Sequence, residues 1–119
     1  MLVRACSNRW TELFERADIL SEGSARQEAH GRVWYGTTSL ILPVEGTDTA
    51  LLAAVAARDV HVRLRALRVA RREACLRAPG RLGRLGCEVQ VKPDVRGVRI
   101  DVDVQAPLIE WSARSRAVR

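Results

Sequence analysis

The chain has 119 residues, of which 47% are hydrophobic and 4% aromatic, and its formal net charge is +6. A chain of this length can bury a core without disulfides or metals, so we expect residues 1–119 to form a single domain, with 1–7 and 112–119 as frayed tails. The longest apolar run, residues 50–57, is too short to cross a membrane, and the first residues lack the apolar core of a signal peptide. These features predict a cytoplasmic protein without a membrane partner.

The cysteines exclude two common ways of stabilising a small protein. Cys6, Cys75 and Cys87 are an odd number at wide spacing, and only His30 and His61 accompany them. This pattern matches neither a disulfide framework nor a zinc site. We therefore expect buried free thiols, no metal and no cofactor.

Positive charge is concentrated in the second part of the chain. Residues 1–50 carry five arginines against seven acidic residues, whereas residues 58–84 carry nine arginines against two. This distribution points to an acidic partner. Nineteen of the twenty basic residues are arginine, but the alanine, valine and glycine content is typical of a high-GC bacterial genome. The preference for arginine over lysine is therefore not by itself a sign of phosphate contacts.

The first predicted helix covers residues 8–21. Ser7 and Asn8 can cap it, and apolar residues then recur from Trp10 to Leu20 at three- and four-residue spacing. Its outward positions are acidic, namely Glu12, Glu15 and Asp18. These carboxylates could neutralise arginines of a later helix, an alternative to an external acidic partner that the sequence leaves open.

Residues 21–31 are polar and bounded by glycine, which predicts a loop. Residues 32–42 are rich in β-branched and aromatic side chains and precede Pro43, which predicts a strand. Gly36, within this run, indicates a bulge or a close approach of the backbone.

Residues 48–78 predict one long helix around which the rest of the fold is organised. Thr47 and Asp48 provide a cap, Pro79 and Gly80 a stop, and no glycine or proline lies between them. An unbroken helix of this length is about 45 Å long.

Two apolar rows run along this predicted helix at seven-residue spacing, on roughly opposite sides. In one interpretation one row packs on the sheet and the other under the first helix. In the other, long helices of two chains pair in a homodimer. The sequence does not decide which row meets the sheet. The candidate oligomerisation residues are Val55, Val62, Val69, Leu76, Val60 and Leu67.

Residues 85–91 and 98–104 alternate between aliphatic and polar side chains, with turn residues between them and Pro107 after them. This pattern predicts an antiparallel hairpin. The expected fold class is α+β, in the order α-β-α-β-β, with a three-stranded sheet covered on one face by the long helix.

No catalytic motif is present, so we expect a protein that is not an enzyme. Asp101 and Asp103 share a strand face with Glu88 nearby, but Lys92 and Arg99 on the same face balance them, which favours a solvated face over a metal site. Gly83 and Gly86 between basic residues form only a common G-x-x-G pattern.

The arginines are the strongest candidates for a functional surface. We expect a non-enzymatic, self-associating interaction module, a dimer, that presents an arginine-rich helix face to an acidic protein. The alternative is a nucleic-acid-binding protein that contacts phosphates, and a domain for a small anionic ligand or nucleotide is more distant. A solvated basic face remains open too, because Asp59 and Glu73 are spaced to pair with arginines four residues later. The candidate anion- or partner-binding residues are Arg58, Arg65, Arg68, Arg72, Arg81 and Arg84.

Overall fold

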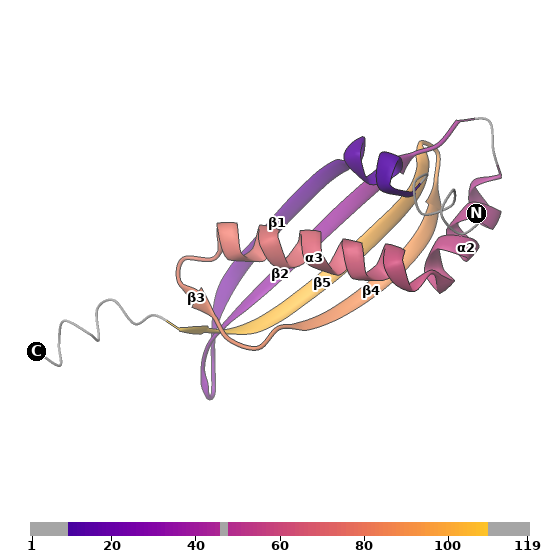
Figure 1. Cartoon of the computed structure of the whole chain (residues 1–119). Coiled ribbons are helices and arrows are strands. Elements are labelled where there is room, and N and C mark those ends of the chain that lie inside the picture. The colour runs from indigo at the N-terminus through magenta and orange to yellow at the C-terminus, as the bar shows by residue number, and fades with distance from the viewer. Residues whose placement is uncertain (1–9, 46–47, 110–119) are drawn as a thin grey trace, which may run out of the picture.

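The computed structural model describes residues 10–45 and 48–109, and it has two layers, an antiparallel sheet with helices on one face (Figure 1). The main strands lie in the order β1-β2-β5-β4, and β3 pairs with the last two residues of β5. The α+β class is confirmed, but the sheet has five strands instead of three. Along the chain the elements are a helix at residues 10–15, β1 (Asp18–Glu28), β2 (Gly31–Pro43), α2 (Thr49–Arg58), α3 (Val60–Arg77), β3 (Arg81–Leu82), β4 (Gly86–Asp94) and β5 (Gly97–Ile109).

The edge strand β1 lies where we predicted the end of the first helix and a loop. We predicted a helix over residues 8–21, but the described part of that helix ends at residue 15; Ser7 and Asn8 lie outside the described residues. β1 then pairs with β2 along its whole length, from Asp18 opposite Ile41 to Glu28 opposite Gly31.

The loop prediction failed because the helix-facing residues at the centre of β1 are small. Ser21 and Ala25 occupy this face, and Gly23 lies between them under the indole ring of Trp34, where a Cβ atom would collide with the ring. The same ring lies against Gly36, at 2.9 Å from the position of a Cβ there. The close approach predicted at Gly36 is therefore made by a side chain. The ring of Trp34, from β2, fills the space above the centre of β1. The sequence of β1 therefore lacks the alternation of large apolar residues that would predict a strand.

The predicted strand at residues 32–42 and the C-terminal hairpin are both confirmed. β2 spans Gly31–Pro43, and β4 and β5 pair from Asp94 opposite Gly97 to Gly86 opposite Gln105. β5 continues through Pro107, where we predicted its end. A proline is tolerated there because its missing N–H lies beyond the last pair of β4, and its carbonyl accepts a hydrogen bond from Gly83 N at 2.8 Å.

The long helix is broken at Asp59, so the prediction of a continuous rod was wrong. Asp59 has φ −86° and ψ 115°, and its carboxylate accepts hydrogen bonds from the backbone N–H groups of His61 and Val62 at 2.9 and 3.2 Å. An aspartate side chain that bonds the backbone in this way competes with helix continuation and caps a new helix. Asp48 caps α2 in the same manner.

The face of α3 that meets the sheet follows a four-residue spacing instead of a heptad. Leu40, Ile100 and the other core residues of β2 and β5 lie beneath it in the same hydrophobic cluster. Short alanine side chains let the helix axis approach the strands closely. The buried residues on this face of α3 are Val62, Ala66, Ala70 and Ala74.

The thiols of Cys75 and Cys87 are exposed, contrary to the prediction of burial, and Cys6 lies outside the described residues. Cys87 pairs with Val104 and so has the inward register that we predicted. It is nevertheless exposed because it lies at the start of an edge strand, and α3 crosses the sheet obliquely (Figure 1). Trp111 and residues 112–119 also lie outside the described part.

Candidate functional site

The outer face of the helical layer combines exposed arginines with exposed large apolar side chains, and we call it the basic apolar face. Leu51, Val60 and Leu76 are 63%, 63% and 70% exposed, values that are high for side chains of this size and type. Five of the ten residues that define this face are large and apolar, whereas the solvent-facing side of an amphipathic helix is normally charged or polar. The basic apolar face consists of Leu51, Val55, Arg58, Val60, Arg63, Leu64, Arg68, Arg71, Arg72 and Leu76.

Most of these arginines have no carboxylate partner among the described residues. Arg77, at the end of α3, pairs with Glu73 at 3.8 Å. Arg63 does not pair with Asp59, whose carboxylate caps α3, and instead donates to the carbonyl oxygen of Ala57 at 3.3 Å. Within residues 10–45 and 48–109, no acidic side chain forms an ion pair with Arg58, Arg68, Arg71 or Arg72.

A groove of about 260 Å³ separates the helix at residues 10–15 from α3. Phe14 and Val62 are apolar and buried in it, whereas Arg68 and His61 are exposed at its rim. The guanidinium of Arg65 lies over the ring of Phe14, 5.2 Å from its centroid. The remaining lining residues are Trp10, Thr11, Asp59 and Leu64.

Internal neutralisation of the arginines by the first helix is not found among the described residues. Glu12 and Glu15 are exposed, and Asp18 lies 3.9 Å from Arg96 near the β4–β5 turn. The first helix meets α3 through the Phe14–Arg65 stacking contact instead. The positive charge of the basic apolar face therefore stays available to a partner.

The structure separates the predicted partner-binding arginines into two groups. Arg58, Arg65, Arg68 and Arg72 lie on the helical layer, Arg65 half-buried. Arg81 lies in β3, and Arg84 lines a hollow on the opposite face of the sheet.

The predicted oligomerisation residues do not form one surface. Val55, Val60 and Leu76 are exposed, and Leu67 and Val69 are half-buried against the core. Val62 is 1% exposed and packs on the sheet, so it cannot contact a second chain. Sequence reasoning also missed Phe14 and Leu64 as groove residues, because the groove exists only where two helices meet.

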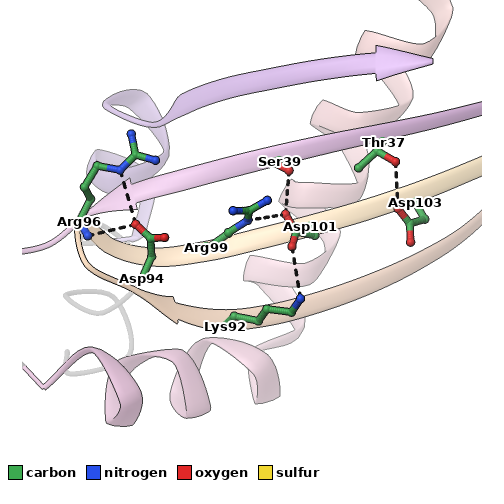
Figure 2. Close-up of polar contacts among 8 residues, drawn as sticks. All are labelled: Thr37, Ser39, Lys92, Asp94, Arg96, Arg99, Asp101 and Asp103. Carbon is green, nitrogen blue, oxygen red and sulfur yellow. Dashed lines mark hydrogen bonds and ion pairs between the residues drawn. The ribbon is translucent and has the colours of Figure 1, made fainter.

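The face of the sheet away from the helices is polar and forms an open hollow of about 1010 Å³ near Thr37 and Asp103. Figure 2 shows the polar contacts on this face. Asp101 accepts hydrogen bonds from Ser39 Oγ at 2.7 Å and Arg99 Nε at 2.9 Å, and Lys92 Nζ lies 3.8 Å from its other oxygen.

Two acidic residues on this face, Asp101 and Asp103, accept hydrogen bonds from side chains of β2. Asp103 accepts a hydrogen bond from Thr37 Oγ1 at 3.1 Å, and Glu88 is its register partner on β4. No group of three or more potential ligands suited to a metal ion occurs in the described part of the chain. In the G-x-x-G segment, the N–H of Gly83 bonds the carbonyl of Pro107 and so is already used within the fold.

Comparison with protein-family models, curated proteins and solved structures found no match for this chain. In the described part, the helices are all too short or too polar to span a bilayer.

We expect Asp101→Asn to lower the free energy of unfolding by about 1 kcal/mol at neutral pH. Burial raises the pKa of Asp101, but hydrogen bonds from Arg99 and Ser39 and the charges of Arg99 and Lys92 outweigh it, so the pKa lies below its ordinary value of 3.8. Because the native pKa is the lower one, this stabilisation is present above the ordinary value and is lost as the pH falls through the native pKa.

Urea unfolding of the wild type and Asp101→Asn between about pH 2 and pH 7 measures this effect. The two free energies should differ at neutral pH and converge in acid. Asp103→Asn is the control, because only a neutral hydroxyl donates to Asp103. A pH-independent difference for Asp101→Asn would contradict the assignment.

Proposed function

We propose that this protein is a non-enzymatic interaction module whose basic apolar face binds an acidic protein segment that also carries apolar side chains. The observation that carries the proposal is that the exposed surface of α2 and α3 combines large apolar residues with arginines that lack a described carboxylate partner. Large apolar side chains at this exposure are typical of interaction surfaces when they gather on one face. Arginines among them supply charge pairs and geometric specificity.

The groove beside α3 supports a segment with an apolar anchor. Its buried wall contains Phe14 and Val62, and its rim contains Leu64 and Arg68. A leucine or aromatic side chain of the partner could enter this groove while neighbouring carboxylates meet Arg68 and Arg72, which lie one helical turn apart. Anchors of this kind supply most of the binding energy at protein interfaces.

Nucleic acid is the second candidate, favoured by the unpaired arginines alone. A phosphate backbone would leave Leu64, Val60 and Leu76 uncovered, whereas an acidic amphipathic segment covers both kinds of side chain. The apolar half of the face therefore favours a protein partner.

Selection of peptides from a random displayed library tests the proposal. We expect the wild type to select peptides that combine Asp or Glu with a large apolar residue. Arg68→Glu with Arg72→Glu should weaken the binding of the selected peptides at least tenfold. The matched control, Arg81→Glu with Arg84→Glu, makes the same change in charge away from the helical layer and should bind like the wild type.

Random duplex DNA at low salt is the competing probe. Binding of DNA that is lost in Arg68→Glu with Arg72→Glu, together with no selection of acidic peptides, would replace the proposed function with nucleic-acid binding. An equal loss in both double variants would show that net charge, not this face, is responsible.

A further inference from the structure

The outer edge of β1 is a long, regular strand edge that no described strand covers. Among the described strands, β1 pairs only with β2, over 11 residues in one continuous register and without proline. β4, at the other side of the sheet, contains Pro93 opposite Val98. Native proteins commonly protect open edges with proline, bulges or charged side chains. β1 has no proline and no bulge, and its charged side chains are of both signs.

The pairing pattern identifies which backbone groups point to this open edge. The two-residue loop between β1 and β2 makes Glu28 and Gly31 the closing pair, whose backbone groups bond each other. Since hydrogen-bonded and non-hydrogen-bonded pairs alternate, the odd-numbered residues of β1 direct their N–H and C=O groups outward. The pairing of β2 with β5 follows the same alternation: Pro43, which lacks an N–H, lies opposite Gly97 at a non-hydrogen-bonded position. The outward residues are Ile19, Ser21, Gly23, Ala25 and Gln27.

We propose that two copies of this chain pair through β1, antiparallel and with the two-fold axis at Ser24. In this register Glu22 lies opposite the partner's Arg26, and symmetry repeats the pair, so two cross-strand charge pairs form on the polar face of the sheet. These are non-hydrogen-bonded positions, where opposite side chains are closest. Both side chains are exposed in the single chain, and Arg26 also stacks on the ring of Tyr35.

Neighbouring registers are less favourable. Pairing centred at Gly23 places Asp18 opposite the partner's Glu28, and pairing centred at Glu22 places that carboxylate opposite its own copy. Like charges directly opposite each other destabilise a strand pair. A shift of one strand by a single residue is excluded. It would place odd-numbered residues, whose backbone N–H and C=O groups point outward, opposite even-numbered residues, whose groups point toward β2.

The consequence is a continuous sheet that joins the four main strands of each copy, with both helical layers on the same side. Two basic apolar faces would then point in one direction and bind a partner bivalently. The edge pairing itself does not depend on the proposed function, since it uses neither the groove nor the arginines of α3.

Sedimentation equilibrium at several protein concentrations tests the proposal. We expect the wild type to have twice the mass of one chain and Glu22→Arg to weaken the dimer about tenfold or more, because it sets like charges opposite each other twice. The double variant Glu22→Arg with Arg26→Glu should restore the dimer, although it loses the stacking of Arg26 on Tyr35, 4.8 Å from the ring centroid.

Gln27→Pro gives a second, backbone test. It removes an outward N–H at an exposed position and should produce a monomer, with a circular dichroism spectrum that matches the wild type. The double variant Arg68→Glu with Arg72→Glu changes α3 but not β1, so it should remain a dimer. This result would distinguish a dimer formed through β1 from one formed through α3. A wild type that is monomeric at the highest concentration, or a dimer that survives both Glu22→Arg and Gln27→Pro in folded protein, would overturn the proposal.

Discussion

Gly97→Ala is expected to lower the free energy of unfolding by about 3 kcal/mol or more, the largest effect of any substitution discussed for this chain. Gly97 has φ +149°, a conformation that L side chains rarely adopt. A Cβ atom there would also collide with the carbonyl oxygen of Leu42 and lie 2.7 Å from the backbone nitrogen of Val44. These atoms belong to the backbone, which is fixed where Val44 N donates to Arg96 O at 3.1 Å.

Gly31→Ala separates the cost of the positive φ from the cost of the Cβ collision. Gly31 also has a positive φ, +124°, but a Cβ atom there would have no neighbour within 4 Å. The variant should therefore lose only about 1 kcal/mol, from the backbone conformation. Urea unfolding followed by circular dichroism measures both variants, and equal losses would show that the contact with Leu42 does not contribute.

Ala70→Leu should lower the free energy of unfolding by about 1–3 kcal/mol, because it forces a larger side chain into a filled space. Ala70 is fully buried between Ala66 and Ala74 on the face of α3 that meets the sheet. The longer side chain would push α3 away from β2 and β5. It would also shift the arginines on the opposite side of α3 relative to the first helix.

Ala54→Leu is the matched control for this prediction. Ala54 lies on α2 and is exposed, so the same change should alter the free energy of unfolding by less than about 0.5 kcal/mol. Thermal and urea unfolding of the two variants provide the comparison. A similar small effect at both positions would mean that α3 does not pack closely on the sheet.

Patterns confined to a single element were reliable in this sequence. The alternation in residues 98–104 predicts β5 because one face is aliphatic and the other polar, and the structure has Val98, Ile100 and Val102 fully buried. The strand at residues 32–42, predicted from its β-branched and aromatic side chains, is also confirmed. The cap at Asp48 and the stop at Pro79 also lie within one residue or two of the observed helix ends.

Predictions failed where two segments had to fit each other. β1 has small inward residues because Trp34, a residue of another strand, fills its space. Asp59 interrupts the helix by capping α3, although no glycine or proline lies near it. The seven-residue rows did not predict the face of α3 that meets the sheet. That face has alanines at four-residue spacing, which are only weakly apolar but allow close packing on the sheet.

The sequence by itself determined the α+β class, the C-terminal hairpin and the concentration of arginine between residues 58 and 84. Local propensity and charge suffice for these features, because each depends on residues near one another in the chain. Only the tertiary structure decided which arginines share a face with exposed leucines, that Arg84 lies on the other side of the sheet, and that β1 forms an open edge. These features arise from the packing of distant segments, and no periodicity within one segment encodes how it meets another.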